Sequence, residues 1–429
     1  MKVVKSRGVL LTGLVGCLAL SAFSDGVTIS DVVVRQRWPW SRLVDISYVL
    51  TCDATQQVDI AVSAHDGSLP LSLPMDSLSG DLYGVGAGQH RIVWNPLKSA
   101  YTNDVLTRFS VTLTPQPVPL YMIIDLKKSA GAAGQVEYLY AEDAATNKYG
   151  SWEYNFVTNA GEVIPSVVWT GVTNDTLYKT KTDKLVLRRV PAGSYGMGDS
   201  TNIAVTLTKS MYASVFQMTA AQWYCIVYGI STTETKPQSF SYNDLRGATD
   251  GVPAVDWPRT GSLVAPNSAV ARLRDKTGFN GFDLPTDSQW EYLCRAGTTT
   301  AFNDGNSDAK INETGVIEDN NNGNTNKYLN VLGWYLYNSG VTRHPVGEKR
   351  PNAWGLYDMH GNIWEYCLNY HSSNGADFGG TDPTGPETGE KRVLRGGNCD
   401  SPAYQCRTAH RSLIVPTGGY GGRLVIKLP

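Results

Sequence analysis

The sequence predicts an α+β protein in which an all-β module precedes a larger, loop-rich domain with few helices. Residues from about 27 to 115 contain runs that alternate apolar and polar side chains, without any helical pattern. The 43 glycines among 429 residues are typical of chains rich in loops and turns. After about residue 184, capping signals mark three short helices.

The composition limits the classes of partner. Charged residues make up 18% of the chain, and the formal net charge is −2. That balance argues against nucleic acid or an anionic membrane surface as the main partner. The length suffices for two or three domains with at least one sizeable core.

Residues 1–24 have the features of an export signal. Three basic residues precede an apolar run from Val9 to Phe23, and Ala22-Phe23-Ser24 fits a cleavage site. Leu14-Val15-Gly16-Cys17 also resembles a bacterial lipobox, in which Cys17 would be lipidated. Two interpretations therefore stay open: a secreted or periplasmic protein, and a lipoprotein that meets the membrane only through a lipid on Cys17.

The module from about residue 27 to 115 is predicted to be an immunoglobulin-like β-sandwich. Val58–Ser63 and Phe109–Thr114 alternate in the manner of half-buried strands. Turn signals such as Asp66-Gly67 separate the strand-like runs. Trp38-Pro39-Trp40 could form a binding tip, but packing in the core or against a sheet edge is the favoured expectation. No motif in this module carries chemistry.

Residues 116–183 are interpreted as a connector. Leu120–Leu126 is one strong strand, and the segments around Gly131–Gly134 and Thr170–Asp183 have the composition of loops. We expect the strands of this connector to add to a neighbouring sheet.

Residues 184–429 are expected to form one domain in which three helices begin at capping residues. Thr219 and Thr286 each open a capping box, and Asn267 is a candidate cap. The first two helices are expected to end at Gly229 and Gly278, and Gly297 follows the third. Cys225 and Cys294 fall within two of the helices and are expected to be buried core thiols.

The stretch from Pro351 to Cys367 has neither helical nor strand periodicity. Asp358 and Glu365 flank Gly361 and Asn362, so a looped backbone could direct two carboxylates and several carbonyls at one point. Oxygen ligands of that kind suit a hard cation such as Ca²⁺. The spacing matches no EF-hand loop, and an aromatic-rich turn with two solvated acids is the alternative.

The same stretch, "PNAWGLYDMHGNIWEYC", resembles a signature of the formylglycine-generating enzyme family, also called the sulfatase-modifying-factor family. Five further blocks of residues 184–429 resemble family motifs in the same order. They are Val190–Gly198, Val215–Trp223, Asp283–Thr298, Arg392–Gly397 and Gly422–Leu424.

The resemblance implies a C-type-lectin-like fold, in which a few helices and short sheets hold long loops around a calcium site. The family's calcium ligands carry over onto four positions of this chain. Asp358 and Glu365 would supply carboxylates, and Gly361 and Ile363 would supply backbone carbonyls.

Oxidases of this family bind Cu(I) through two cysteines and convert a cysteine of a sulfatase to formylglycine. This chain departs from their pattern, because Ser401 stands where the first cysteine is expected and Cys399 is displaced by two positions. Cys406 fits the second position only when counted from Gly397. Cys399 and Cys406 could bind copper, close a disulfide or stay free. Trp364 matches an active-site tryptophan and is equally a core aromatic.

Two functions follow from these observations. The first is a copper-dependent oxidase that acts on a sulfatase or another exported protein, with Cys399, Cys406 and Trp364 as its catalytic residues. The second is a non-catalytic, calcium-stabilised scaffold that binds a glycan or a protein. The displaced cysteines favour the scaffold on mechanistic grounds, whereas the family resemblance favours the oxidase.

Overall fold

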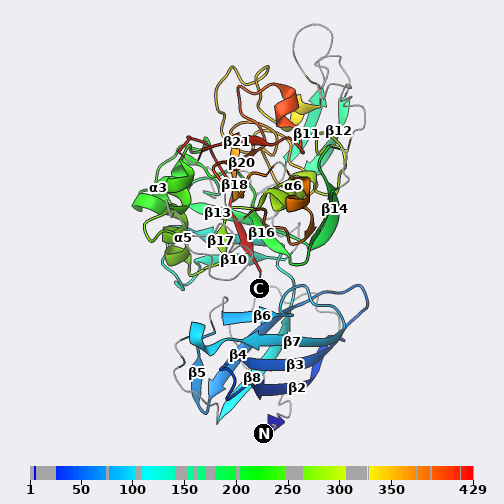
Figure 1. The fold of residues 1–429 in the computed structure, drawn as a ribbon, viewed down its shortest axis with the longest axis vertical. Coiled ribbons are helices and arrows are strands. Elements are labelled where there is room, and N and C mark those ends of the chain that lie inside the picture. Colours follow the sequence, from blue (N-terminus) through cyan, green and yellow to red (C-terminus); the bar gives the residue numbers. More distant parts are fainter. Residues whose placement is uncertain are drawn as a thin grey trace. The chain divides into compact units, whose positions relative to one another are not determined.

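Figure 1 shows the fold in a computed structural model of the chain. The structure describes residues 4–5, 26–73, 77–99, 101, 108–140, 152–157, 163–169, 179–199, 203–247, 264–305, 326, 328–372, 374–386, 389–415 and 417–428. The lipobox cysteine Cys17 and most of the predicted export signal lie outside these residues.

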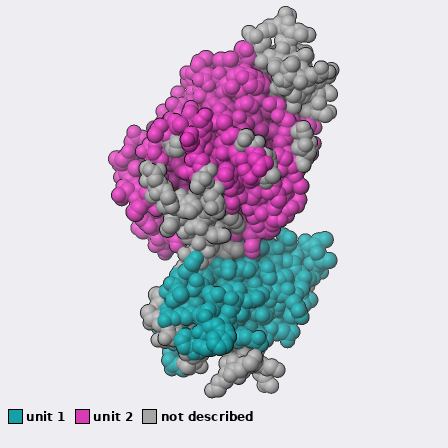
Figure 2. All heavy atoms as spheres, in the orientation of Figure 1, with its two compact units in different colours: residues 1–118, 429 teal, residues 119–428 magenta. Residues whose placement is uncertain are grey.

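The chain divides into two compact units, coloured separately in Figure 2. Unit 1 comprises residues 1–118 and residue 429, and unit 2 comprises residues 119–428. Among the described residues, none of the helices is both long enough and apolar enough to cross a membrane.

Unit 1 is built from two antiparallel sheets. The first has the order β1 (Val4–Lys5), β2 (Thr28–Gln36), β3 (Val44–Thr51), β7 (Gly88–Trp94) and β6 (Leu78–Gly80). The second has the order β5 (Leu69–Leu71), β4 (Asp59–Asp66) and β8 (Phe109–Gln116). The two runs that alternate in sequence are β4 and β8, and they pair with each other along their full length.

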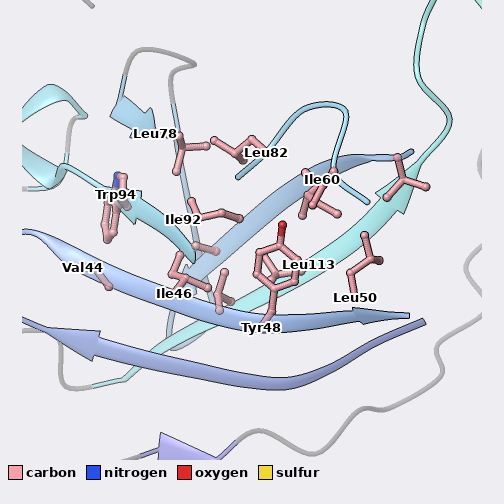
Figure 3. Packing of buried hydrophobic residues seen from close by; sticks show 14 residues of the cluster. Val44, Ile46, Tyr48, Leu50, Ile60, Leu78, Leu82, Ile92, Trp94 and Leu113 are labelled. Atoms are coloured by element: carbon pink, nitrogen blue, oxygen red, sulfur yellow. The ribbon is translucent and has the colours of Figure 1, made fainter. Parts of the chain in front are cut away.

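One apolar core joins the two sheets of unit 1. Ile46 and Ile92 from the first sheet share a buried cluster with Ile60 and Leu113 from the second, and the labelled side chains point into a common interior (Figure 3). The alternation predicts this arrangement because successive side chains of a strand face opposite sides. The immunoglobulin-like assignment stays a prediction.

The expected burial of Trp38-Pro39-Trp40 is wrong. Trp40 is 88% exposed and Trp38 is 47% exposed, in the turn between β2 and β3. The sequence could not reveal this, because a tryptophan in a turn packs inward only when the turn folds back over the sheet.

Unit 2 is organised around a six-stranded sheet. Its order is β10 (Val136–Leu139), β9 (Tyr121–Asp125), β13 (Lys184–Val190), β16 (Met211–Ser214), β22 (Val425–Lys427) and β17 (Phe282–Asp283). Strands β9 and β10 come from the predicted connector, and β9 pairs with β13. The connector's β11 (Trp152–Val157) and β12 (Val163–Trp169) pair with each other.

Two three-stranded sheets complete the β-structure of unit 2. One has the order β14 (Gly193–Met197), β15 (Ile203–Leu207) and β19 (Gly380–Thr381). The other has the order β18 (Glu365–Tyr370), β20 (Arg392–Arg395) and β21 (Ser412–Ile414). Among the described residues, 333–364 contain neither a helix nor a strand, in line with the loop-rich composition.

The helices of unit 2 are short. They are α3 (Ala220–Tyr228), α4 (Tyr242–Arg246), α5 (Ala269–Thr277), α6 (Asp287–Arg295) and α7 (Leu329–Leu332). Both predicted capping boxes are present, at Thr219 before α3 and at Thr286 before α6.

The predicted cap of α5 is wrong by one residue. Ser268, not Asn267, is the N-cap, and its hydroxyl accepts a hydrogen bond from the backbone N–H of Ala271. Both residue types suit an N-cap, so sequence alone does not separate two such neighbours. Gly278 ends the helix in the left-handed conformation, as predicted.

Candidate cation site and cysteine region

The stretch from Pro351 to Cys367 folds as a looped backbone that ends in β18. Asp358, Gly361 and Asn362 all have positive φ, at 56°, 99° and 66°. A methyl group on Gly361 would overlap the carbonyl O of Trp334, so glycine is needed there for space as well as for φ. The turns bring the carbonyls of Gly361 and Ile363 close to the carboxylate of Glu365.

The side chain of Gln217 marks the point at which these oxygens converge. Its Nε2 lies 3.1 Å from the carbonyl O of Asp358, 3.2 Å from that of Gly361 and 3.1 Å from that of Ile363. It also lies 3.0 Å from Oε1 of Glu365. Three of the four predicted calcium ligands therefore direct an oxygen at one buried point.

Glu365 is enclosed by donors as well. The guanidinium of Arg423 contacts both carboxylate oxygens, at 2.8 Å each, and Nε1 of Trp290 donates to Oε2 at 2.7 Å. All three side chains are buried. The charge of Glu365 is balanced by Arg423, so this carboxylate is held in place by protein donors alone.

The carboxylate of Asp358, the other predicted carboxylate ligand, has fewer hydrogen-bond donors than that of Glu365. Oδ2 accepts a hydrogen bond from the backbone N–H of Gly347 at 2.8 Å. Oδ1 is buried and has no hydrogen-bond partner among the described residues. Burial raises the pKa of Asp358 to about 6, because the charged form loses solvation.

These residues fit a hard cation by their chemistry. They offer two carboxylates and clustered backbone carbonyls, and Oδ1 of Asp358 is a buried oxygen without a donor. Within the described residues, no three His, Cys, Asp or Glu side chains group closely enough to hold a metal ion. A cation here would therefore depend on carbonyl oxygens as much as on carboxylates.

The first cysteine of the predicted pair, Cys399, lies beside this loop. Its backbone N–H donates to the carbonyl O of Asn362 at 3.2 Å, and its carbonyl accepts from the hydroxyl of Ser339. The side chain is 7% exposed. Burial raises the pKa of its thiol, which disfavours the thiolate that binds metals.

Cys406, the second, ends the short 3-10 helix η5 (Ala403–Cys406) and is fully buried. It belongs to an apolar cluster with Phe302, Leu329 and Tyr335. Gly397 leaves the room for its sulfur, because a methyl group at that glycine would overlap Sγ. Neither Cys399 nor Cys406 forms a disulfide in this structure.

Trp364, the third predicted catalytic residue, is buried and packs against His410, with ring centroids 5.9 Å apart. Burial, together with the nearby charges of Arg407 and Arg395, lowers the pKa of His410 to about 4. The imidazole is therefore neutral at pH 7. Ser401, at the expected place of the first cysteine, accepts a hydrogen bond from the backbone N–H of Asn398 at 3.0 Å.

Sequence reasoning missed Gln217, Arg423 and Trp290 as parts of the site, although each lies in a recognised block. A faint signal was present: Gln217 and Arg423 are single polar residues within otherwise apolar runs. Such residues are buried with their neighbours and must find polar partners. The sequence does not say which partners they find.

Comparison with known proteins gives a consistent assignment for unit 2. A family model described as "Sulfatase-modifying factor enzyme 1-like domain" matches residues 174–426. The formylglycine-generating enzyme of Streptomyces coelicolor is 33% identical over 165 residues, which are 37% of this chain and 48% of that enzyme. The enzyme of Mus musculus is 28% identical over 232 residues, 51% of this chain and 54% of that one. The chain thus spans about half the length of the curated relatives it matches.

Among solved structures, one match is titled Treponema denticola variable protein 1. It is 21% identical and covers 57% of this chain and 96% of its own, with a TM-score of 0.41.

Proposed function

The chain belongs to the sulfatase-modifying factor family, and we propose that its C-terminal unit is a binding scaffold of that family rather than a copper oxidase. The observation that carries this proposal is the environment of the cysteines. Cys406 is fully buried in an apolar cluster, and Cys399 is a buried thiol whose pKa is raised. Cu(I) requires thiolates, and a substrate cysteine would have to reach them.

The copper-dependent oxidase is the second candidate function. Its support is the similarity to formylglycine-generating enzymes and the presence of Trp364 beside His410. In that case Cys399 and Cys406 would hold the copper ion, which would supply the oxygen chemistry when bound. The partner would be a sulfatase or another exported protein that offers a cysteine.

Titration with Cu(I) separates the two candidates. The purified full chain is titrated against a chromophoric Cu(I) chelator, beside Cys399→Ser and Cys406→Ser. We expect the wild type to compete no better than either variant. We also expect no aldehyde in a sulfatase-derived cysteine peptide incubated with copper and oxygen. Tight binding lost in both variants, together with aldehyde formation, would establish the oxidase instead.

We propose calcium as the ion of this scaffold, held by Asp358 and Glu365 with the carbonyls of Gly361 and Ile363. The proposal is supported by the convergence of the Gly361 and Ile363 carbonyls with Oε1 of Glu365, and by the unpartnered Oδ1 of Asp358. Bound calcium would neutralise the excess of negative charge in the loop. Its role is to hold the loops in place, and no chemical step involves it.

For the partner we propose an exported protein, with a glycan as the competing outcome. Tyr224, Tyr228 and Ile230, in and just after α3, are exposed, and the two tyrosine rings lie 5.3 Å apart. Exposed aromatic side chains are enriched at protein interfaces. Crosslinking in the extracytoplasmic fraction of the source cell should yield a protein adduct that the double variant Tyr224→Ser, Tyr228→Ser loses. Glycan-array binding without an adduct would favour the glycan.

Export itself is also proposed, on the sequence features of residues 1–24. Mass spectrometry of the mature protein gives the answer. Cleavage after Ser24 indicates a secreted or periplasmic form, and a lipid on Cys17 indicates the lipoprotein. An intact Met1 would contradict export.

A further inference from the structure

The carboxamide of Gln217 stands where the oxygens of the proposed calcium site converge. Its Nε2 has four oxygen neighbours between 3.0 and 3.2 Å: the carbonyls of Asp358, Gly361 and Ile363, and Oε1 of Glu365. Gln217 is fully buried, so bulk solvent does not reach these contacts. A single nitrogen thus occupies the centre of a cage of oxygens.

The number of hydrogens does not match the number of oxygens. A carboxamide NH₂ carries two hydrogens, so it cannot donate a full hydrogen bond to all four acceptors. Several oxygens around one central point are the arrangement that a hard cation satisfies. The NH₂ group, with its partial positive charge, satisfies the same arrangement only in part.

The charges around these four oxygens also favour a cation at their centre. Asp358 and Glu365 are both buried, and Arg423 makes a close ion pair with Glu365. Among the described residues, Oδ1 of Asp358 and Oε1 of Gln217 are buried without a hydrogen-bond partner. The site therefore has unused oxygens and a carboxylate without a close ion pair of its own, although the positive charges of Arg423 and Lys181 both act on Asp358.

We propose that Gln217 is an internal substitute for the cation. Its NH₂ group holds the four oxygens together when the cation is absent, and the cation displaces it on binding. The inference rests on the proposed calcium site and adds two consequences for the wild-type chain. The loop keeps its shape without calcium, and the competing amide weakens the affinity of the wild-type chain for the ion.

Gln217→Glu tests this directly, because it keeps the size of the side chain, removes the donor and adds a third carboxylate. In EDTA, the thermal midpoint of the C-terminal unit should fall by roughly 5–10 °C. In millimolar CaCl₂ most of this loss should be recovered. Calorimetric titration should show at least about tenfold tighter Ca²⁺ binding than wild type, since one more charged oxygen joins the ligands.

Gln222→Glu is the matched control. Gln222 is a buried glutamine five positions along the chain, and its Nε2 donates to the carbonyl O of Lys184 at 2.8 Å. Its Oε1 accepts from Thr219 N–H, a bond that glutamate preserves. We expect this variant to lose stability without any recovery in calcium. Gln217→Ala, which removes the amide without adding charge, should show a larger calcium-induced rise than wild type and covers the case in which Gln217→Glu does not fold.

Each outcome decides the proposed role of Gln217, the proposed calcium site, or both. If Gln217→Glu keeps the wild-type thermal midpoint in EDTA, the proposal that the Gln217 amide replaces the cation is overturned. The same proposal is overturned if Gln217→Glu and Gln217→Ala both lose thermal stability and calcium does not restore it, although the wild type binds calcium. A response in the variants but none in wild type supports the inference and removes calcium from the natural function. No response in any of the three removes both.

Discussion

Arg423 and Glu365 form a bidentate ion pair in the interior of unit 2, with both N–O distances at 2.8 Å and both side chains fully buried. Arg423 also donates to the carbonyls of Tyr357 and Ser214, at 2.9 and 3.1 Å. The pair therefore connects the loop, strand β16 and the C-terminal segment. Its two members are 58 positions apart in the chain.

Arg423→Met should destabilise the C-terminal unit by about 3–5 kcal/mol, because it leaves Glu365 buried without its countercharge. The measurement is the denaturant midpoint of that unit's unfolding transition. Lys127→Met is the control, because it removes an exposed ion pair in which Nζ of Lys127 lies 3.8 Å from Oδ2 of Asp183. Its cost should stay below about 1 kcal/mol. Equal costs for the two variants would contradict a structural role for the buried pair.

Calcium should raise the thermal midpoint of the wild-type C-terminal unit, as expected for any ligand of the native state. At a concentration 100 times the dissociation constant, the gain is about 2.7 kcal/mol. Asp358→Ala and Glu365→Ala should abolish the rise, whereas Asp400→Ala, which removes an exposed carboxylate, should not. An unchanged response in both site variants would remove this ion site.

His410 should make the C-terminal unit less stable as the pH falls from about 6.5 to 4. Burial, Arg407 and Arg395 lower its pKa to about 4 in the native state, while Asp199 acts in the opposite sense. The unfolded chain takes up this proton near pH 6.5, so it binds more protons than the native state throughout that window.

Allowing for partial exposure, the loss should be about 1–2 kcal/mol, and His410→Gln should remove it. The measurement is the free energy of unfolding as a function of pH. His65→Gln, in unit 1, serves as the control and should leave the profile of the C-terminal unit intact. A profile that His410→Gln does not flatten would refute this assignment.

Asp287 should stabilise the C-terminal unit above its ordinary pKa. Burial alone would raise the pKa of Asp287, but its ion pairs with Arg395 and Arg411 lower it below 3.8. The stabilisation is complete above that value and is lost as the pH falls through the lower native-state pKa. Asp287→Asn should cost about 3–5 kcal/mol at pH 7.

The control for Asp287 is Asp199→Asn, whose carboxylate pairs with Arg407 at the surface. Chemical denaturation at pH 7 should show a cost below about 1 kcal/mol for that variant. If Asp287→Asn is equally mild, the buried pairs contribute no more than surface ones.

Gly333→Ala should be strongly destabilising, because a methyl group there would overlap the carbonyl O of His360. We expect a cost of about 3 kcal/mol or more in the thermal unfolding of unit 2. Gly340→Ala separates this clash from conformational strain. Gly340 has φ +63° and no atom within 4 Å of the added methyl group. That variant should cost only about 1 kcal/mol, and similar costs for both would argue against close packing at His360.

Local structure was largely predictable from sequence. Thr219 and Thr286 open helices through capping boxes, and β4 and β8 follow the alternation of their residues. These features depend on interactions within a few residues or on a period of two. The N-cap of α5 is Ser268 and not Asn267, and residue type does not separate the two because both suit an N-cap.

The sequence by itself determined the family, the short helices, the alternating strands and the positions of Asp358 and Glu365 in one loop. Only the tertiary structure decided that the Gln217 side chain donates to oxygens of that loop, that Arg423 neutralises Glu365, and that Cys406 is enclosed by apolar side chains. The physical reason is that capping and alternation act between near neighbours. The partner of a buried amide, guanidinium or thiol is chosen by how distant segments pack, and its own residue type does not encode that choice.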